Sequence, residues 1–120
     1  MATIKAYTDL SQSKKLAEIL PIESADMYYP NRTDIKYQGA LPIEFKHGNP
    51  LLSQEIAAWS LAALLDVLPE YNLQKTDWGN KTEYKIVVTI DEDNYTSKNY
   101  DNPLDACVAM IEKLNELNML

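Results

Sequence analysis

The sequence is poor in the residues on which most active sites and metal centres depend. It contains one histidine, His47, one cysteine, Cys107, and only three glycines among 120 residues. A single cysteine forms no internal disulfide, and one histidine with one cysteine gives none of the ligand spacings of a structural zinc site. So few glycines also leave no glycine-rich phosphate-binding loop. The sequence therefore predicts neither a metal nor a cofactor.

A serine or cysteine nucleophile would have to use His47 as its base, because the chain has no other histidine. Cys107 lies on the apolar side of an expected helix, where a cysteine acts as a small core residue. Ser60 follows Trp59 inside an expected helix and lacks the glycines of a nucleophile elbow. These positions favour a non-enzymatic protein. The alternative is a small enzyme or ligand-binding domain whose site combines sequence-distant residues, such as His47 or a pair of carboxylates.

The acidic run that begins at Asp91 has part of the pattern of a calcium-binding loop. Tyr95 stands where an oxygen ligand is needed, Thr96 stands where the turn glycine belongs, and Asn102 replaces the closing glutamate. We therefore expect no tight calcium site in this run.

Basic residues are too few and too scattered for a nucleic-acid partner. Eleven lysines and arginines oppose eighteen acidic residues, which gives a net charge of −7, and no segment clusters the cations that neutralise phosphates. No apolar run reaches the roughly 18 residues of a membrane span. Residues 1–20 also lack the charged and apolar parts of a secretory signal. A reducing cytoplasm is the expected location.

Periodic apolar residues predict three helices. The longest apolar run, residues 51–69, predicts a buried central helix capped by Ser53 and ended by Pro69. An earlier helix is expected to end at Leu20, with Thr8 or Ser11 as its cap. Asn102 is expected to cap a last helix, with Pro103 in its first turn. The apolar stripe of that helix consists of Cys107, Met110, Ile111, Leu114 and Leu117.

Strands are expected at residues 27–29, 71–77, 82–90 and 95–100, and the alternation in 82–90 is the clearest. A chain of this length is expected to form a single domain, residues 1–120. The predicted fold class is α+β. A small antiparallel β-sheet, a meander of about three to four strands built mainly from residues 71–101, would pack on one face against about three α-helices.

Residues 30–50 have no clean periodicity and are interrupted by prolines and glycines. Long irregular segments of compact domains usually carry function. Aromatic residues in and beside this segment would supply the rigid contact area that interfaces favour. They are Tyr28, Tyr29, Tyr37 and Phe45. We expect part of this set to be exposed and to form a partner or homo-oligomer surface; the alternative is that the set covers one end of the sheet.

Four parts of the sequence give the chain a resemblance to a known set of proteins: residues 8–9 with 13–17, 23–28, 58–65 and 101–111. Their most specific pieces are Trp-Ser-Leu-Ala-Ala-Leu-Leu and Asp-Asn-Pro-Leu-Asp-Ala-Cys. Together they resemble short, uncharacterised proteins of gut Bacteroides-type bacteria and their phages or mobile elements. The resemblance implies a cytoplasmic protein, but no activity. The leading hypothesis is therefore a non-enzymatic accessory protein that binds another protein or itself.

Overall fold

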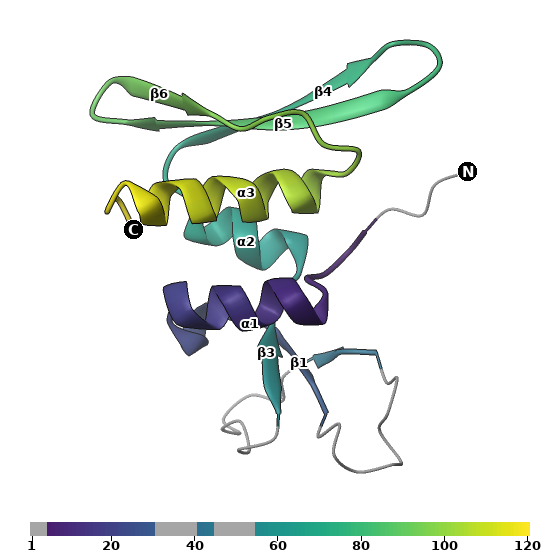
Figure 1. The fold of residues 1–120 in the computed structure, drawn as a ribbon, viewed down its shortest axis with the longest axis vertical. Helices are drawn as coiled ribbons and strands as arrows, with labels where there is room; N and C mark the ends of the chain where they lie inside the picture. The colour runs from purple at the N-terminus through teal and green to yellow at the C-terminus, as the bar shows by residue number, and fades with distance from the viewer. Residues whose placement is uncertain (1–4, 31–40, 45–54) are drawn as a thin grey trace.

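The structure, a computed structural model, describes residues 5–30, 41–44 and 55–120 (Figure 1). These ranges contain three α-helices, one 3-10 helix and six strands. In chain order they are α1 (Leu10–Ile19), η1 (Ile22–Ser24), β1 (Met27–Tyr29), β2 (Ile43–Glu44), β3 (Ile56–Ala58), α2 (Leu61–Val67), β4 (Tyr71–Asp77), β5 (Thr82–Ile90), β6 (Asp93–Thr96) and α3 (Pro103–Glu116). Within the described ranges, no helix has the length and apolar character needed to cross a membrane.

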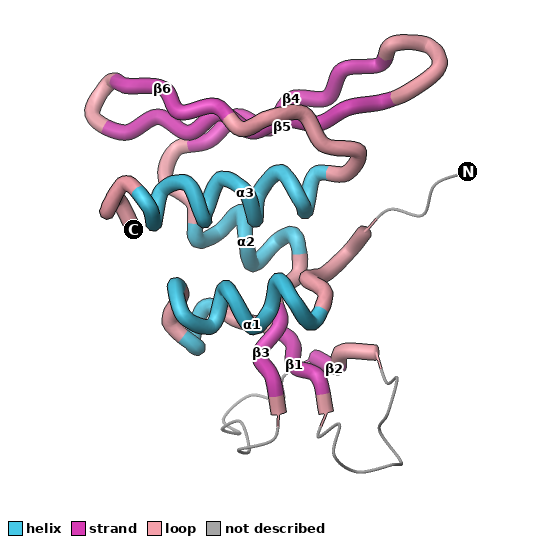
Figure 2. Tube along the Cα trace, in the orientation of Figure 1, coloured by secondary structure: helices cyan, strands magenta, loops and turns pink. Residues whose placement is uncertain are grey.

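The strands form two antiparallel three-stranded sheets, ordered β4-β5-β6 and β2-β1-β3. The larger sheet lies on α3, α2 lies beside α3, and α1 separates these helices from the smaller sheet at the opposite end (Figures 1 and 2). The predicted α+β class, with a small antiparallel sheet packed by helices, is confirmed. Of the smaller sheet only β1 was predicted, because β2 has just two residues and β3 lies in the apolar run that was predicted as a helix.

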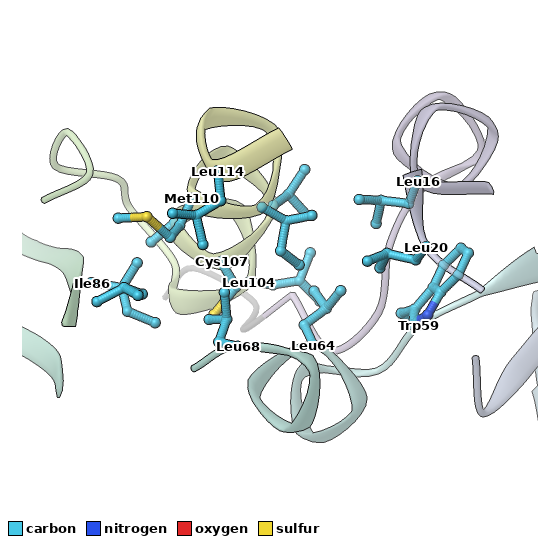
Figure 3. Packing of buried hydrophobic residues seen from close by; sticks show 14 of the residues in the cluster. Leu16, Leu20, Trp59, Leu64, Leu68, Ile86, Leu104, Cys107, Met110 and Leu114 are labelled. Atoms are coloured by element: carbon cyan, nitrogen blue, oxygen red, sulfur yellow. The ribbon is translucent and has the colours of Figure 1, made fainter. Parts of the chain in front are cut away.

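Helix α3 begins where the sequence predicts. The Asn102 side chain accepts a hydrogen bond from the Asp105 amide at 2.8 Å, and Pro103 occupies the first turn. The expected stripe is buried, except for Leu117, which is 48% exposed because the helix ends at Glu116. A continuous row of apolar side chains leads from Ile86 on β5, through α3 and α2, to α1 and its neighbours (Figure 3).

Strands β4 and β5 have the predicted bounds, and Ile86 and Val88 face the core as expected. The third strand was misplaced in the sequence prediction. It runs over Asp93–Thr96 rather than residues 95–100, because the chain reverses directly after Ile90 through two residues with positive φ.

The predicted central helix is wrong in its first half. Ile56–Ala58 form β3, which pairs with β1, and α2 begins only at Leu61. Ser60, rather than Ser53, is its cap, and accepts a hydrogen bond from the Ala63 amide at 3.2 Å. Ser53 lies outside the described residues. Alanine and leucine fit a helix equally well at either start, so the pairing of β3 with β1 decides the boundary.

Helix α1 is capped by Asp9, not by Thr8 or Ser11. The Asp9 carboxylate accepts from the Gln12 amide at 2.8 Å, and the Gln12 side chain accepts from the Asp9 amide at 3.1 Å, which forms a capping box. Thr8 is buried instead, because its side chain bonds to Trp59 and Ser13.

A polar junction, formed by the buried residues Thr8, Ser13, Tyr29 and Trp59 with the partly buried Ser24, joins the N-terminal segment to η1, β1 and the start of α2. The Trp59 amide donates to Thr8 Oγ1 at 3.0 Å, and Thr8 Oγ1 lies 2.8 Å from Ser13 Oγ. The Tyr29 hydroxyl donates to the Thr8 carbonyl at 2.7 Å, and Trp59 Nε1 donates to Ser24 Oγ at 3.0 Å. Four hydrogen bonds therefore tie together residues up to 51 positions apart.

Candidate interaction surface

Ser60 and Cys107, the two nucleophile candidates weighed from the sequence that the structure describes, are held in structural roles. Burial raises the pKa of the Cys107 thiol to about 12, so at neutral pH it is a protonated core side chain, as the sequence predicts. The Ser60 hydroxyl donates to the Asp26 carboxylate and caps α2. His47 lies outside the described residues. These contacts account for Ser60 and Cys107 without a catalytic role.

Two carboxylates at the starts of α1 and α3, those of Asp9 and Asp105, share one lysine. Lys5 Nζ lies 3.1 Å from Asp9 Oδ2 and 3.0 Å from Asp105 Oδ1, and Gln12 donates to the same Asp105 oxygen at 2.8 Å. Burial alone would raise the pKa of Asp105. Hydrogen bonds from Asn102, Gln12 and Lys5 nevertheless hold it below its ordinary 3.8.

The pKa of Asp9 is lowered too. Desolvation opposes this shift, but the Gln12 amide and Lys5 outweigh it. A glycoside-cleaving pair needs one carboxyl with a raised pKa that carries the proton for the leaving group. Because both pKa values are lowered, this cluster joins two helix starts and supplies no general acid.

An open groove between α1 and α3 is lined by Lys15, Glu18, Ile19, Glu112, Asn115 and Glu116. It contains three carboxylates and one ammonium, but none of the chain's serines, threonines or its cysteine. Across the described part of the chain, no three His, Cys, Asp or Glu side chains lie close enough together to hold a metal ion. The groove therefore resembles a charged solvent-facing seam rather than a built binding site.

The structure describes two of the four aromatic residues of the predicted partner surface. Tyr29 is 6% exposed, and its hydroxyl belongs to the polar junction. Tyr28 is half-buried on β1, beside Ile43 of β2, which is 47% exposed. Tyr37 and Phe45 lie outside the described residues. Tyr29 is therefore a buried residue of the smaller sheet, and it contributes no exposed aromatic surface.

A different surface stands out on the larger sheet. One face packs on α3, and no described element lies beyond the other face (Figures 1 and 2). The β4–β5 hairpin also extends past the first turn of α3 (Figure 2). At its tip Gly79 has φ +88°, and Trp78, which is 60% exposed, donates its amide to the Lys81 carbonyl at 2.8 Å. A hydrogen-bonded turn therefore presents a tryptophan to solvent.

Strand β4 is an edge of this sheet, since the described strands pair with it only on the β5 side. The residues directly before and after β4, Glu70 and Trp78, are even-numbered, and both bond to the β5 side. The Thr89 amide donates to the Glu70 carbonyl at 2.9 Å, and the Trp78 amide donates to the Lys81 carbonyl. Main-chain groups alternate between the two sides of an antiparallel strand. The odd-numbered residues, Tyr71, Leu73, Lys75 and Asp77, therefore direct their amides and carbonyls away from β5.

This set of groups, which we call the β4 edge, was missed at the level of sequence. Residues 71–77 were predicted as a strand, but sequence alone does not say which strand is outermost. A tryptophan directly before a Gly-Asn turn was the available signal, because a hairpin tip has little around it to bury a large ring.

Comparisons of the chain with protein-family models, curated proteins and solved structures found no match.

Proposed function

We propose that this protein is a non-enzymatic accessory protein that binds another protein chain by strand addition to the β4 edge. The observation that carries the proposal is the edge itself, seven residues long, with no proline, glycine or bulge in its register with β5. An extended chain bonds readily to such an edge, and its side chains then contact the two faces of the sheet. Trp78 adds a large aromatic contact at one end.

Proteins usually protect exposed edges with short strands, prolines or clustered charge. The opposite edge of the same sheet has this protection. Strand β6 has four residues, and Asp91, Glu92 and Asp93 gather three carboxylates at its start. Strand β4 is nearly twice as long and carries one lysine and one aspartate. The contrast between the two edges supports a binding role for β4 alone.

In keeping with the resemblance described above, we propose that the protein acts in the cytoplasm of a gut Bacteroides-type bacterium, either uninfected or infected by a phage. The test is affinity capture from such cells with mass spectrometry, using wild type, Lys75→Pro and Thr96→Pro as bait. Lys75 directs its amide outward from β4, so proline removes an edge donor and leaves the β4–β5 ladder intact. Thr96 occupies the equivalent outward position on β6, because the adjacent Ser97 amide bonds to Ile86.

We expect a protein that is retained by wild type and by Thr96→Pro but lost with Lys75→Pro. Trp78→Ala should weaken its capture without lowering the melting temperature, because the ring is exposed. Capture that is equal for the two proline variants, or no captured protein at all, would contradict the proposal.

A further inference from the structure

We infer that the chain occupying the β4 edge is a second copy of this protein, paired antiparallel about a two-fold axis at Gln74. The inference rests on the proposed function, because it names the partner of the same edge. The result would be a six-stranded sheet, β6-β5-β4 continued by β4-β5-β6 of the second copy. Because antiparallel pairing about an axis perpendicular to the sheet preserves its faces, α3 of both copies would lie on one side.

The hydrogen-bonding pattern restricts where the axis can lie. In an antiparallel pair, residues that exchange both hydrogen bonds must direct them toward each other, so odd-numbered residues must oppose odd-numbered residues. An axis at Leu73 would bring Pro69, which has no amide hydrogen, opposite Asp77 of the second copy. An axis at Gln74 pairs all four outward residues. It gives about eight main-chain hydrogen bonds, more than its neighbours allow.

Side chains favour the same register. An axis at Lys75 would place two ammonium groups opposite each other, which is unfavourable in a sheet. With the axis at Gln74, the opposing side chains carry no like charges and several can form hydrogen bonds. The pairs are Tyr71 with Asp77, Leu73 with Lys75, Asn72 with Thr76, and Gln74 with itself.

Charge also selects this edge for self-association. Each chain carries a net charge of −7, so two copies repel unless the surfaces that meet are neutral. Strand β4, with Lys75 and Asp77, has no net charge, whereas β6 begins among Asp91, Glu92 and Asp93. The neutral edge is therefore the one that a second copy of an acidic chain can approach.

The exposed apolar surface lies where the second copy would cover it. Tyr71 is 43% exposed although its neighbour across the ladder, Val88, is fully buried on the α3 side. The Tyr71 ring therefore stands on the core face of the sheet at its uncovered margin. Trp78 lies on the outer face, opposite Glu70 of the second copy in this register. Pairing would thus remove part of two large aromatic side chains from water.

The test is a charge exchange at the axis, measured as solution mass by sedimentation equilibrium over a range of concentrations. Wild type should approach twice the 13.7 kDa of the chain. Gln74→Lys and Gln74→Glu each place like charges opposite each other, so each should weaken dimerisation at least about tenfold. An equimolar mixture of the two should restore the dimer, because the heterodimer pairs opposite charges.

Thr96→Lys and Thr96→Glu are the matched controls, since they introduce the same charges on an exposed residue of the other edge. They should leave the mass unchanged. A wild type that stays monomeric at the highest concentration overturns the inference. Dimerisation that is equally strong in wild type and in both Gln74 variants overturns it too. A monomer that still captures a host protein in a Lys75-dependent manner ends the inference but leaves the proposed function standing.

Discussion

Two regions of the core are held together in different ways. Between α3 and the larger sheet, buried apolar side chains such as Met110 and Ile86 pack together (Figure 3), and the buried polar side chains of the described residues, Thr8 and Ser13, lie elsewhere, in the junction. The polar junction around Trp59 instead combines a buried aromatic ring with four directed hydrogen bonds. Apolar packing is non-directional and tolerates exchanges that conserve volume. A buried polar network needs each hydrogen-bond partner in place, so the junction should tolerate fewer substitutions than the apolar region does.

The largest expected effect is at the centre of the junction. Trp59 is fully buried, and it bonds through both its amide and its ring nitrogen. Trp59→Ala should lower the free energy of unfolding by about 3 to 5 kcal/mol, as truncation of a buried aromatic residue does. Urea unfolding followed by circular dichroism measures the loss.

Trp78→Ala is the matched control for this change, because it removes the same side chain from an exposed hairpin tip. Measured at protein concentrations too low for pairing of β4 edges, its effect should stay within about 0.5 kcal/mol, as for most surface substitutions. Comparable losses at the two tryptophans would show that the junction has no special weight in the fold.

The second prediction separates hydrogen bonding from packing in the junction. Thr8→Val conserves side-chain volume but leaves the Trp59 amide and the Ser13 hydroxyl without their bonds to Thr8 Oγ1. The expected loss is about 1 to 3 kcal/mol in urea unfolding. Thr76→Val, on a position of β4 that is exposed in the single chain, should change stability little at protein concentrations too low for pairing of β4 edges.

A double-mutant cycle sharpens the same comparison. Ser13→Ala combined with Thr8→Val should cost less than the sum of the single changes, because both remove the one Thr8–Ser13 hydrogen bond. Strict additivity would show that these hydroxyls do not act together.

The same contrast explains what the sequence revealed. Helix α3 follows from short-range signals: Asn102 as cap, Pro103 in the first turn, and an apolar stripe repeated at helical spacing. The junction depends on contacts that sequence patterns do not encode. Thr8 was predicted as a helix cap, but its hydroxyl accepts a hydrogen bond from the amide of Trp59, 51 residues away. Ser60 became the cap of α2 with the support of Asp26, 34 residues earlier.

The candidate site was hidden for a related reason. Strand β4 was recognised with its correct ends, yet its place at the margin of the sheet is set by which strands pair, and this is a property of the whole fold. Tyr29, one of the aromatic residues predicted to form the partner surface, differs from Trp78 in its exposure to solvent. Tyr29 is buried because its hydroxyl finds the Thr8 carbonyl. Trp78 is exposed because its hairpin extends beyond the layer that would cover it.

A smaller effect is expected where the two regions meet. Lys5 links Asp9 of α1 to Asp105 of α3, and the pKa of each carboxylate lies below its ordinary 3.8 in the folded chain. A lowered folded pKa contributes stability above the unfolded value, and this stability is lost as the pH falls through 3.8 toward the folded value.

Wild type should therefore lose stability as the pH falls below about 4. Asp105→Asn should lose less over the same range, because part of the titrating charge is gone. The difference should be no more than about 1 kcal/mol, since both carboxylates are partly exposed to solvent. Thermal melting of both proteins from about pH 6 to about pH 3, which spans the ordinary carboxyl range, measures this difference in stability. Parallel pH profiles for the two proteins would contradict this account.

The smallest expected effect lies in the sheet above α3, away from the junction. The β5–β6 turn holds Asp91 at φ +50° and Glu92 at φ +71°, the signs that a type I′ turn requires at both central residues. Glutamate adopts this region at a cost, whereas glycine adopts it freely. Glu92→Gly should therefore raise the free energy of unfolding by about 0.4 to 1 kcal/mol.

Asn80→Gly is the control, because in the β4–β5 turn the positive φ belongs to Gly79 and not to Asn80. That change relieves no strain and makes the unfolded chain more flexible, so it should give no gain. Equal gains from the two glycines in urea unfolding would show that backbone strain at Glu92 is not the cause.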